Sequence, residues 1–116
     1  MNDEIEDLEL SPRMAQVIRA FLEDPLKERY GFELMRTTGL PSGTLYPALA
    51  KLQRAGWLTV GKEDIDPRAE GRPPRRFYRI SAAAVPAARS QLAALSARYR
   101  LPAAVTPRLA AEGGAV

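Results

Sequence analysis

The sequence predicts a mainly α-helical fold that contains one small β-hairpin. Before residue 56, apolar residues recur three and four positions apart, which is the period of a helix with one buried face. After residue 56 the pattern changes to two short apolar and β-branched runs separated by a polar loop, which is typical of a hairpin. A chain of 116 residues, 46% of them hydrophobic, predicts a single domain with a small core.

The first predicted helix covers residues 12–23. Ser11 is suited to cap its first turn, and Pro12 fits the first helical position, where a missing N–H costs nothing. The dipeptide Asp24-Pro25 then ends the helix. Its apolar residues fall on one face: Met14, Val17, Ile18, Phe21 and Leu22.

Two further helices are predicted over residues 30–38 and 43–55, joined by a short turn that contains Gly39. Ser42 is the expected N-cap of the later helix, and Gly56 suits the left-handed position just past its end. Pro47 lies inside this helix and predicts a tighter or tilted first turn. The buried face carries Leu45, Ala48, Leu49 and Leu52, and another face carries Thr44, Pro47, Lys51 and Arg54. Such a helix pair with a basic outer face is typical of a DNA-binding helix-turn-helix.

Residues 57–60 and 76–80 are predicted strands, and residues 61–75 form the polar loop between them. A hairpin directly after a helix-turn-helix predicts the wing of a winged helix. The end of the loop, Gly71 to Arg76, is basic and contains two prolines, so it could enter a minor groove or lie along phosphates. The alternative is an ordinary solvated hairpin tip, which the acidic start of the loop favours.

The C-terminal part predicts a turn over residues 82–85, with Ser81 as a cap candidate, and a helix from Pro86 to about Tyr99. A seam of apolar residues along it resembles a short coiled-coil repeat and predicts a homodimer that also uses the first helix. The residues expected in this interface are Met14, Val17, Ile18, Phe21, Val85, Ala88, Leu92, Leu95 and Tyr99. The alternative is a helix that folds back on its own domain.

Charge and composition narrow the classes of function. Residues 1–33 carry four Lys or Arg against nine Asp or Glu, whereas residues 34–100 carry twelve against four. The basic excess suggests a polyanionic partner, although arginine on an ordinary solvated surface would give the same count. The chain has no cysteine and no histidine, which excludes disulfides, thiolate or imidazole zinc sites and a Ser-His-Asp triad. We therefore expect no enzyme activity, no catalytic or metal-binding residues and no cofactor.

The sequence also predicts where the protein is located in the cell and how the chain is divided into parts. No apolar run approaches the roughly 20 residues that span a bilayer. The first ten residues hold five carboxylates and no cation, unlike a signal peptide, so we expect a cytoplasmic protein without membrane contact. The expected parts are an acidic N-terminal segment (1–10), a winged-helix DNA-binding domain (11–80), a C-terminal dimerisation helix (81–100) and a disordered tail (101–116).

Several separate motifs resemble those of the PadR-like family of bacterial winged-helix transcriptional regulators, specifically its short-tailed subgroup. They are Tyr30-Gly31-Phe32-Glu33-Leu34, Ser42-Gly43-Thr44-Leu45-Tyr46-Pro47-Ala48-Leu49, Leu52 with Gly56-Trp57-Leu58, and Gly71-Arg72-Pro73 with Phe77-Tyr78-Arg79-Ile80-Ser81. The resemblance covers about residues 12–99 and implies a homodimer that typically represses transcription. Some members of the family bind phenolic acids or flat hydrophobic drugs at the dimer interface. Drug-binding members use a tryptophan on the C-terminal helix, whereas the single tryptophan here is Trp57.

The expected function is therefore a homodimeric, sequence-specific DNA-binding regulator, a repressor released by an unidentified ligand. The alternative is a winged-helix module that contacts proteins and does not bind DNA. A small hydrophobic effector is a further expected partner, with Phe21, Leu92 and Tyr99 as candidate pocket walls. Tyr46 has an alternative role, as an aromatic residue packed on the preceding helix. The residues expected to contact double-stranded DNA are Ser42, Gly43, Thr44, Tyr46, Pro47, Lys51, Arg54, Arg72, Arg75 and Arg76.

Overall fold

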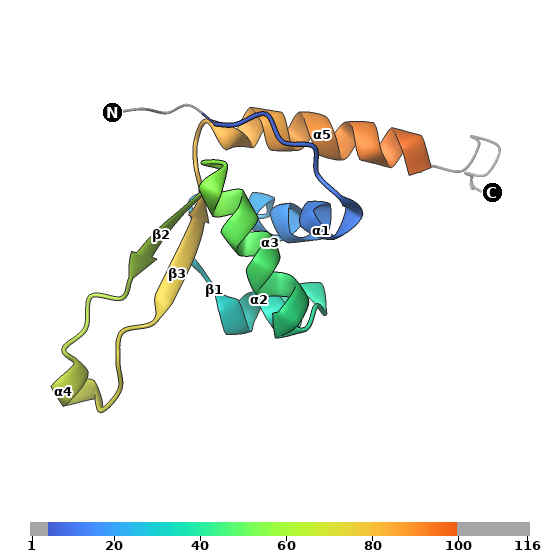
Figure 1. Cartoon of the computed structure of the whole chain (residues 1–116). Coiled ribbons are helices and arrows are strands. Elements are labelled where there is room, and N and C mark those ends of the chain that lie inside the picture. Colours follow the sequence, from blue (N-terminus) through green and yellow to red (C-terminus); the bar gives the residue numbers. More distant parts are fainter. Residues whose placement is uncertain (1–4, 100–116) are drawn as a thin grey trace, which may run out of the picture.

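The computed structural model describes residues 5–99 and arranges three short helices, a small sheet and one longer helix (Figure 1). The helices α1 (Pro12–Leu22), α2 (Gly31–Thr38) and α3 (Ser42–Arg54) follow one another along the chain. The strands β2 (Leu58–Lys62) and β3 (Arg76–Ile80) form an antiparallel hairpin, and α5 (Ala84–Tyr99) then packs on α1. The predicted helix-rich fold with a hairpin is confirmed.

Two elements were not predicted. The short strand β1 (Arg29–Tyr30) pairs with β3, with Arg29 opposite Tyr78, which gives an antiparallel sheet of order β1-β3-β2. The hairpin loop contains one helical turn, α4 (Pro67–Glu70), whose N-cap Asp66 accepts a hydrogen bond from the Arg68 backbone N–H at 3.0 Å. A strand of two residues is too short to produce a visible alternation, and a four-residue helix is too short to produce a helical period.

The start of α3 differs from the prediction by one residue. Pro41, in an extended conformation, is the N-cap, and Ser42 is the first helical residue. The Pro41 carbonyl accepts from the backbone N–H groups of both Thr44 (3.0 Å) and Leu45 (2.9 Å), so the first turn is partly of the tighter 3₁₀ type. The expected left-handed residue past the helix end is Gly56, with a φ of 82°. The bounds of α3 are thus set by backbone geometry at both ends.

The beginning of α5 also differs from the prediction. The helix starts at Ala84, and Pro86 lies in its first turn, where the backbone N–H groups have no helical partner and a proline costs nothing. Ser81 does not cap the helix, because its hydroxyl donates to the Gly56 carbonyl at 2.8 Å. In the described part of the chain, no helix combines the length and apolar character required to cross a membrane.

The core lies where α1, α2, α3, the sheet and the first turns of α5 meet. Ala88 of α5 is fully buried in it, so α5 and the preceding elements share one core. Five residues that the sequence placed in a dimer interface are covered by their own chain, with at most 7% of their surface exposed: Met14, Val17, Ile18, Phe21 and Ala88. The largest buried side chains are Trp57, Phe21, Ile18, Leu34, Leu45, Leu49, Leu52 and Val17.

The described part of the acidic N-terminal segment, residues 5–10, crosses from the end of α3 to α5. The Glu6 N–H donates to the Ala55 carbonyl at 2.8 Å, and the buried Trp57 indole N–H donates to the Glu6 carbonyl at 2.9 Å. Further along, the Gln91 side chain of α5 accepts from the Leu10 N–H and donates to the Leu8 carbonyl. This segment therefore ties the start of the hairpin to the last helix.

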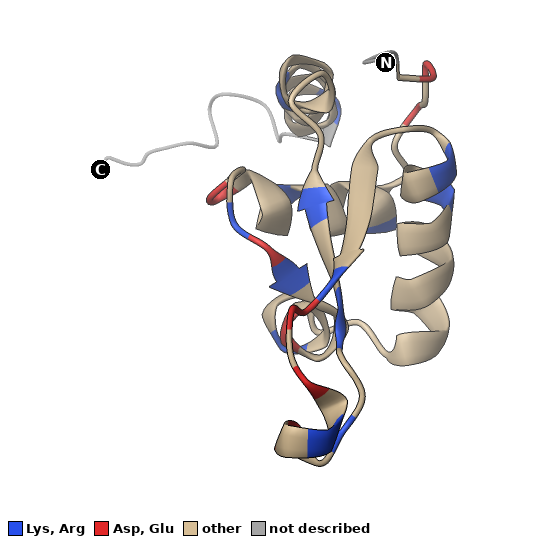
Figure 2. Cartoon of the chain, turned by 90° about the vertical axis from the view of Figure 1, so that its left-hand side faces the viewer, with Lys and Arg blue, Asp and Glu red and all other residues tan. Residues whose placement is uncertain are grey.

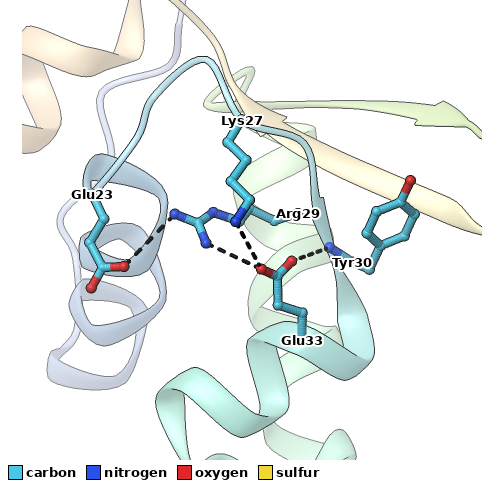
Figure 3. A network of polar contacts seen from close by, with 5 residues as sticks. All are labelled: Glu23, Lys27, Arg29, Tyr30 and Glu33. Carbon is cyan, nitrogen blue, oxygen red and sulfur yellow. Dashed lines mark hydrogen bonds and ion pairs between the residues drawn. The ribbon is translucent and has the colours of Figure 1, made fainter.

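A buried arginine connects α1, β1 and α2 (Figure 3). The Arg29 guanidinium, 6% exposed, pairs with Glu33 at 3.4 Å and with Glu23 at 3.8 Å. Glu33 also pairs with Lys27 at 3.5 Å and accepts from the Tyr30 backbone N–H at 3.3 Å. Partial burial alone would raise the pKa of Glu33, but this backbone hydrogen bond and the charges of Lys27 and Arg29 outweigh it and lower the pKa.

We expect Arg29→Ala to lower the free energy of unfolding by about 3 kcal/mol, because it leaves Glu33 partly buried without its closest cation. The matched control is Lys27→Ala, which removes an equal charge from the exposed side of the same carboxylate and should cost about 0.5 kcal/mol or less. Urea unfolding followed by circular dichroism measures both values. Equal effects of the two substitutions would contradict a structural role for the buried cation.

Candidate nucleic-acid interface

The outer face of α3 is open to solvent over its whole length. Leu45, Leu49 and Leu52 are fully buried, which turns the opposite side of the helix outward. Of the residues predicted on this helix for DNA contact, Thr44 is half-buried and the others are exposed: Ser42, Gly43, Tyr46, Pro47, Lys51 and Arg54. Figure 2 shows no acidic residue on α3, in contrast to the hairpin, which carries both acidic and basic residues.

The basic side chains at the end of α3 carry uncompensated charge. Lys51 and Arg54 lie in its last turn and are exposed, and within residues 5–99 neither side chain reaches a carboxylate. A solvated cation with no carboxylate partner can bind a phosphate without first breaking an ion pair. This end of α3 is therefore suited to contact a polyanion.

The hairpin loop is held closed by Glu63. This carboxylate accepts from the Arg72 guanidinium at 2.7 Å and 3.4 Å and from the Arg75 backbone N–H at 2.8 Å. These hydrogen bonds from Arg72 and Arg75 lower the pKa of Glu63, and the same pairing raises the pKa of Arg72. Arg72, predicted to contact DNA, therefore has its charge neutralised by Glu63, and a phosphate would have to compete for it.

The base of the hairpin and α3 meet at one cavity of about 420 Å³, here called the aromatic pocket. Arg75 places its guanidinium 5.3 Å from the centre of the Phe32 ring, and Phe32 stacks on Tyr30 at 5.8 Å between ring centres. Two of the three predicted hairpin residues, Arg75 and Arg76, are exposed and line this pocket together with Tyr46 of α3. The full lining is Tyr30, Gly31, Phe32, Tyr46, Arg75, Arg76 and Tyr78.

The environment of Tyr46 bears on the alternative role considered for it, packing on the preceding helix. A Cβ atom on Gly31 would lie 2.0 Å from the Tyr46 hydroxyl oxygen, so the phenol occupies space that only a glycine leaves at the start of α2. Tyr46 nevertheless keeps 42% of its surface exposed. It therefore packs on α2 and faces solvent at once, and it forms one wall of the aromatic pocket.

Four pocket residues did not appear among the predicted site residues: Tyr30, Gly31, Phe32 and Tyr78. Their signal in the sequence was the cluster of aromatic residues around Gly31, but nothing in the spacing showed that this cluster faces the hairpin. Burial is the main cause that raises the pKa of Tyr30, and the charges of Glu63 and Glu28 add to it against those of Arg75 and Arg72. Its hydroxyl therefore stays protonated at neutral pH and can donate a hydrogen bond.

Within residues 5–99, no group of three acidic side chains is placed so that it could hold a metal ion. No protein-family model, no curated protein and no solved structure matches the chain. The proposals below therefore rest on the geometry and the charges of these residues.

We expect the hairpin loop to loosen at acidic pH. Because the pKa of Glu63 in the folded chain lies below its ordinary value of 4.5, the carboxylate contributes stability above that value. This contribution is lost as the pH falls through the lowered pKa. The Arg75 amide proton, which bonds to Glu63, reports the change in an NMR titration.

Two substitutions that each remove one negative charge separate the hydrogen bonding of Glu63 from a general effect of charge in the loop. Glu63→Gln should release Arg72 and increase amide exchange across residues 63–75 at neutral pH, whereas Asp64→Asn removes the neighbouring charge and should leave exchange unchanged. Unchanged exchange in Glu63→Gln would show that the carboxylate does not hold the loop.

Proposed function

We propose that this chain is a homodimeric, sequence-specific DNA-binding transcriptional regulator, and that α2, α3 and the β2–β3 hairpin act as a winged helix-turn-helix. In this proposal the first turns of α3 enter the major groove and the base of the wing lies along the adjacent backbone. The motifs that resemble PadR-like regulators agree with it and favour a cytoplasmic bacterial repressor. A small ligand that releases the repressor from DNA belongs to the same proposal.

One observation carries the proposal more than any other. Tyr46, on the exposed and acid-free face of α3, lines a single pocket together with two arginines of the hairpin, Arg75 and Arg76. Within residues 5–99, no carboxylate pairs with either arginine side chain. The hairpin thus presents unpaired positive charge beside a hydrogen-bonding side chain of α3, as binding to a DNA backbone requires.

Gly43 supplies a second argument. It lies exposed in the first turn of α3, and a Cβ added there would meet no atom within 4 Å. The fold itself therefore has no need of glycine at this position, which even costs helix stability relative to alanine. A glycine is explained if the backbone here must approach a phosphate closely.

The direct experiment is a mobility-shift titration on the DNA upstream of the chain's own gene, against an unrelated duplex of equal length. If about six phosphates are neutralised, log K should fall with log salt with a slope of about −5. Binding that ignores both salt and sequence would contradict the proposal.

We expect Gly43→Ala to weaken DNA binding about tenfold while leaving the fold as stable as before or up to about 1 kcal/mol more stable. The added methyl group meets nothing in the free chain but would separate the backbone from a phosphate. Mobility shifts and thermal unfolding measure the two effects. The matched control is Ser90→Ala, an equally small change on the exposed part of α5, which should leave binding unchanged.

A Gly43→Ala variant that binds DNA as well as the natural chain would count against close approach at this turn. The competing proposal is a module for protein contacts alone, which the acidic residues of the hairpin favour. It requires Lys51→Glu to be harmless, whereas the DNA-binding proposal requires this substitution to reduce affinity.

The homodimer is proposed from the face of α5. Leu92 and Leu95 are only half-buried and, with Pro12, Ala15 and Arg19, line a shallow hollow of about 200 Å³ between α5 and α1. Val85 is likewise half-buried, while the side chain of Tyr99 and the predicted tail (101–116) lie outside the described residues. We propose that a second copy covers this hollow, using residues of α5 and the rim of α1 rather than its buried core residues.

Light scattering should therefore give twice the chain mass of 12.8 kDa at micromolar concentration. Leu92→Glu with Leu95→Glu should give the monomer, because two buried charges would oppose association. Ala93→Glu with Ala94→Glu is the matched control, since both alanines are exposed and their substitution should keep the dimer. Circular dichroism checks that each variant is folded, and a natural chain that stays monomeric would contradict the homodimer.

A further inference from the structure

We propose that residues 5–10, here called the strap, set the direction of α5 and thereby, in the homodimer, the separation of the two α3 helices. Gln91 is the positioning residue of this device. The effect on α5 stands on the single chain, whereas the separation of the α3 helices rests on the proposed function. Figure 1 shows the strap passing along α5 before it enters α1.

The strap begins at the corner between α3 and β2. The last carbonyl groups of a helix have no helical partner, and the Ala55 carbonyl accepts from the Glu6 N–H at 2.8 Å. The Trp57 indole, only 1% exposed, needs an acceptor inside the fold and finds it in the Glu6 carbonyl at 2.9 Å. The backbone of a single strap residue therefore satisfies two groups of this corner.

The second attachment of the strap lies on α5. The Gln91 side-chain oxygen accepts from the Leu10 N–H at 2.9 Å, and the Gln91 amide group donates to the Leu8 carbonyl. One side-chain amide thus uses both its acceptor and its donor on the strap backbone. Leu10 is 2% exposed and the next residue, Ser11, caps α1, so the strap continues directly into the core.

The same corner also holds the beginning of α5. The Ser81 N–H donates to the Trp57 carbonyl at 2.9 Å, and the Ser81 hydroxyl donates to the Gly56 carbonyl at 2.8 Å. Ala84, the first residue of α5, donates its N–H to the Ser81 carbonyl at 3.0 Å. The corner is therefore joined to α5 at two points, directly through Ser81 and, through the strap, at Gln91. Two points of attachment define the direction of a rigid helix.

Burial alone does not fix the second half of α5. Ala84 and Ala88 are fully buried, but none of the described residues of this helix after Ala88 is buried, and Leu92 and Leu95 are half-buried. With 16 residues α5 is about 24 Å long, so a tilt of about 10° about its first residue moves its other end by about 4 Å. A dimer formed through α5 passes such a tilt on to both α3 helices.

The strap is held by few interactions of its own. The side chains of Glu6, Asp7 and Glu9 are exposed, and within residues 5–99 no Lys or Arg pairs with them. A segment with so few contacts opens more easily than the core. In the natural chain, the Glu6 and Leu10 amides should therefore exchange through one common opening, with the same dependence on urea, before the amides of the core.

The first test uses two substitutions in the full chain. Gln91→Met removes both hydrogen bonds to the strap, and Gln91→Glu keeps the size of the side chain but cannot donate to the Leu8 carbonyl. Either should raise the amide exchange rate of Glu6, at the other end of the strap, about tenfold. Ser90→Met and Ser90→Glu are the matched controls on an exposed residue of the same helix and should leave this rate unchanged. Circular dichroism checks that each variant is folded.

The second test measures the direction of α5 with spin labels. The chain has no cysteine, so labels can be attached at Gln53→Cys on α3 and Ala94→Cys on α5, two exposed positions. A doubly labelled chain in an excess of unlabelled chain reports the distance within one chain, whatever its oligomeric state. The natural chain should give one narrow distance distribution, and either Gln91 substitution should shift or widen it. A chain labelled at Gln53→Cys alone reports the distance between the two α3 helices, which should change with it.

The outcomes separate the strap from the proposed function. Unequal dependence of the Glu6 and Leu10 amides on urea, or faster exchange at Leu10 alone in the variants, would show that the strap does not act as one unit. An unchanged distance between α3 and α5 would show that the strap does not set the direction of α5. If singly labelled chains give no distance, the homodimer fails, and the doubly labelled chain still decides the role of the strap by itself.

Discussion

The burial of one face of α3 determines which side chains the molecule offers to its surroundings. Leu45, Leu49 and Leu52 fill the core against α1 and α2, and the helix cannot rotate without exposing them. Three leucines buried at about 2 kcal/mol each make such a rotation costly. The exposed order of glycine, tyrosine, lysine and arginine along the outer face follows directly from this constraint.

The main helices and the hairpin could be predicted because each leaves a long periodic signal or a clear end. Ser11 and Pro12 set the start of α1, and glycines at residues 39 and 56, with φ of 74° and 82°, follow α2 and α3. The outward position of Lys51 and Arg54 follows from the same period. The predicted N-cap of α3 was wrong by one residue. The structure has Pro41 there, because an extended proline carbonyl can accept the first helical hydrogen bonds without any side chain.

The contacts between distant segments could not be predicted. Nothing in the sequence shows that Glu63 meets Arg72 rather than another cation, or that the Tyr46 phenol lies in the space left by Gly31. The apolar face of α1 illustrates the ambiguity most clearly, since a stripe that packs inside one chain and a stripe that packs between two chains have the same period. The structure assigns Ile18 and Phe21 to the inside. The four pocket residues that escaped prediction did so for the same reason, since they are contributed by β1, α2 and β3.

The contact between Trp57 and the segment from Glu6 to Leu10 makes the intrinsic tryptophan fluorescence sensitive to the position of this segment. Trp57 is the sole tryptophan, and its indole donates its hydrogen bond to this segment rather than to a neighbouring element. Gln91 of α5 forms hydrogen bonds with the same segment. Displacement of α5 would disturb this segment and the hydrogen bond that it accepts from the indole of Trp57, which is only 1% exposed. The emission maximum of the unlabelled protein would then move to longer wavelength, and motion of α5 could be followed in solution.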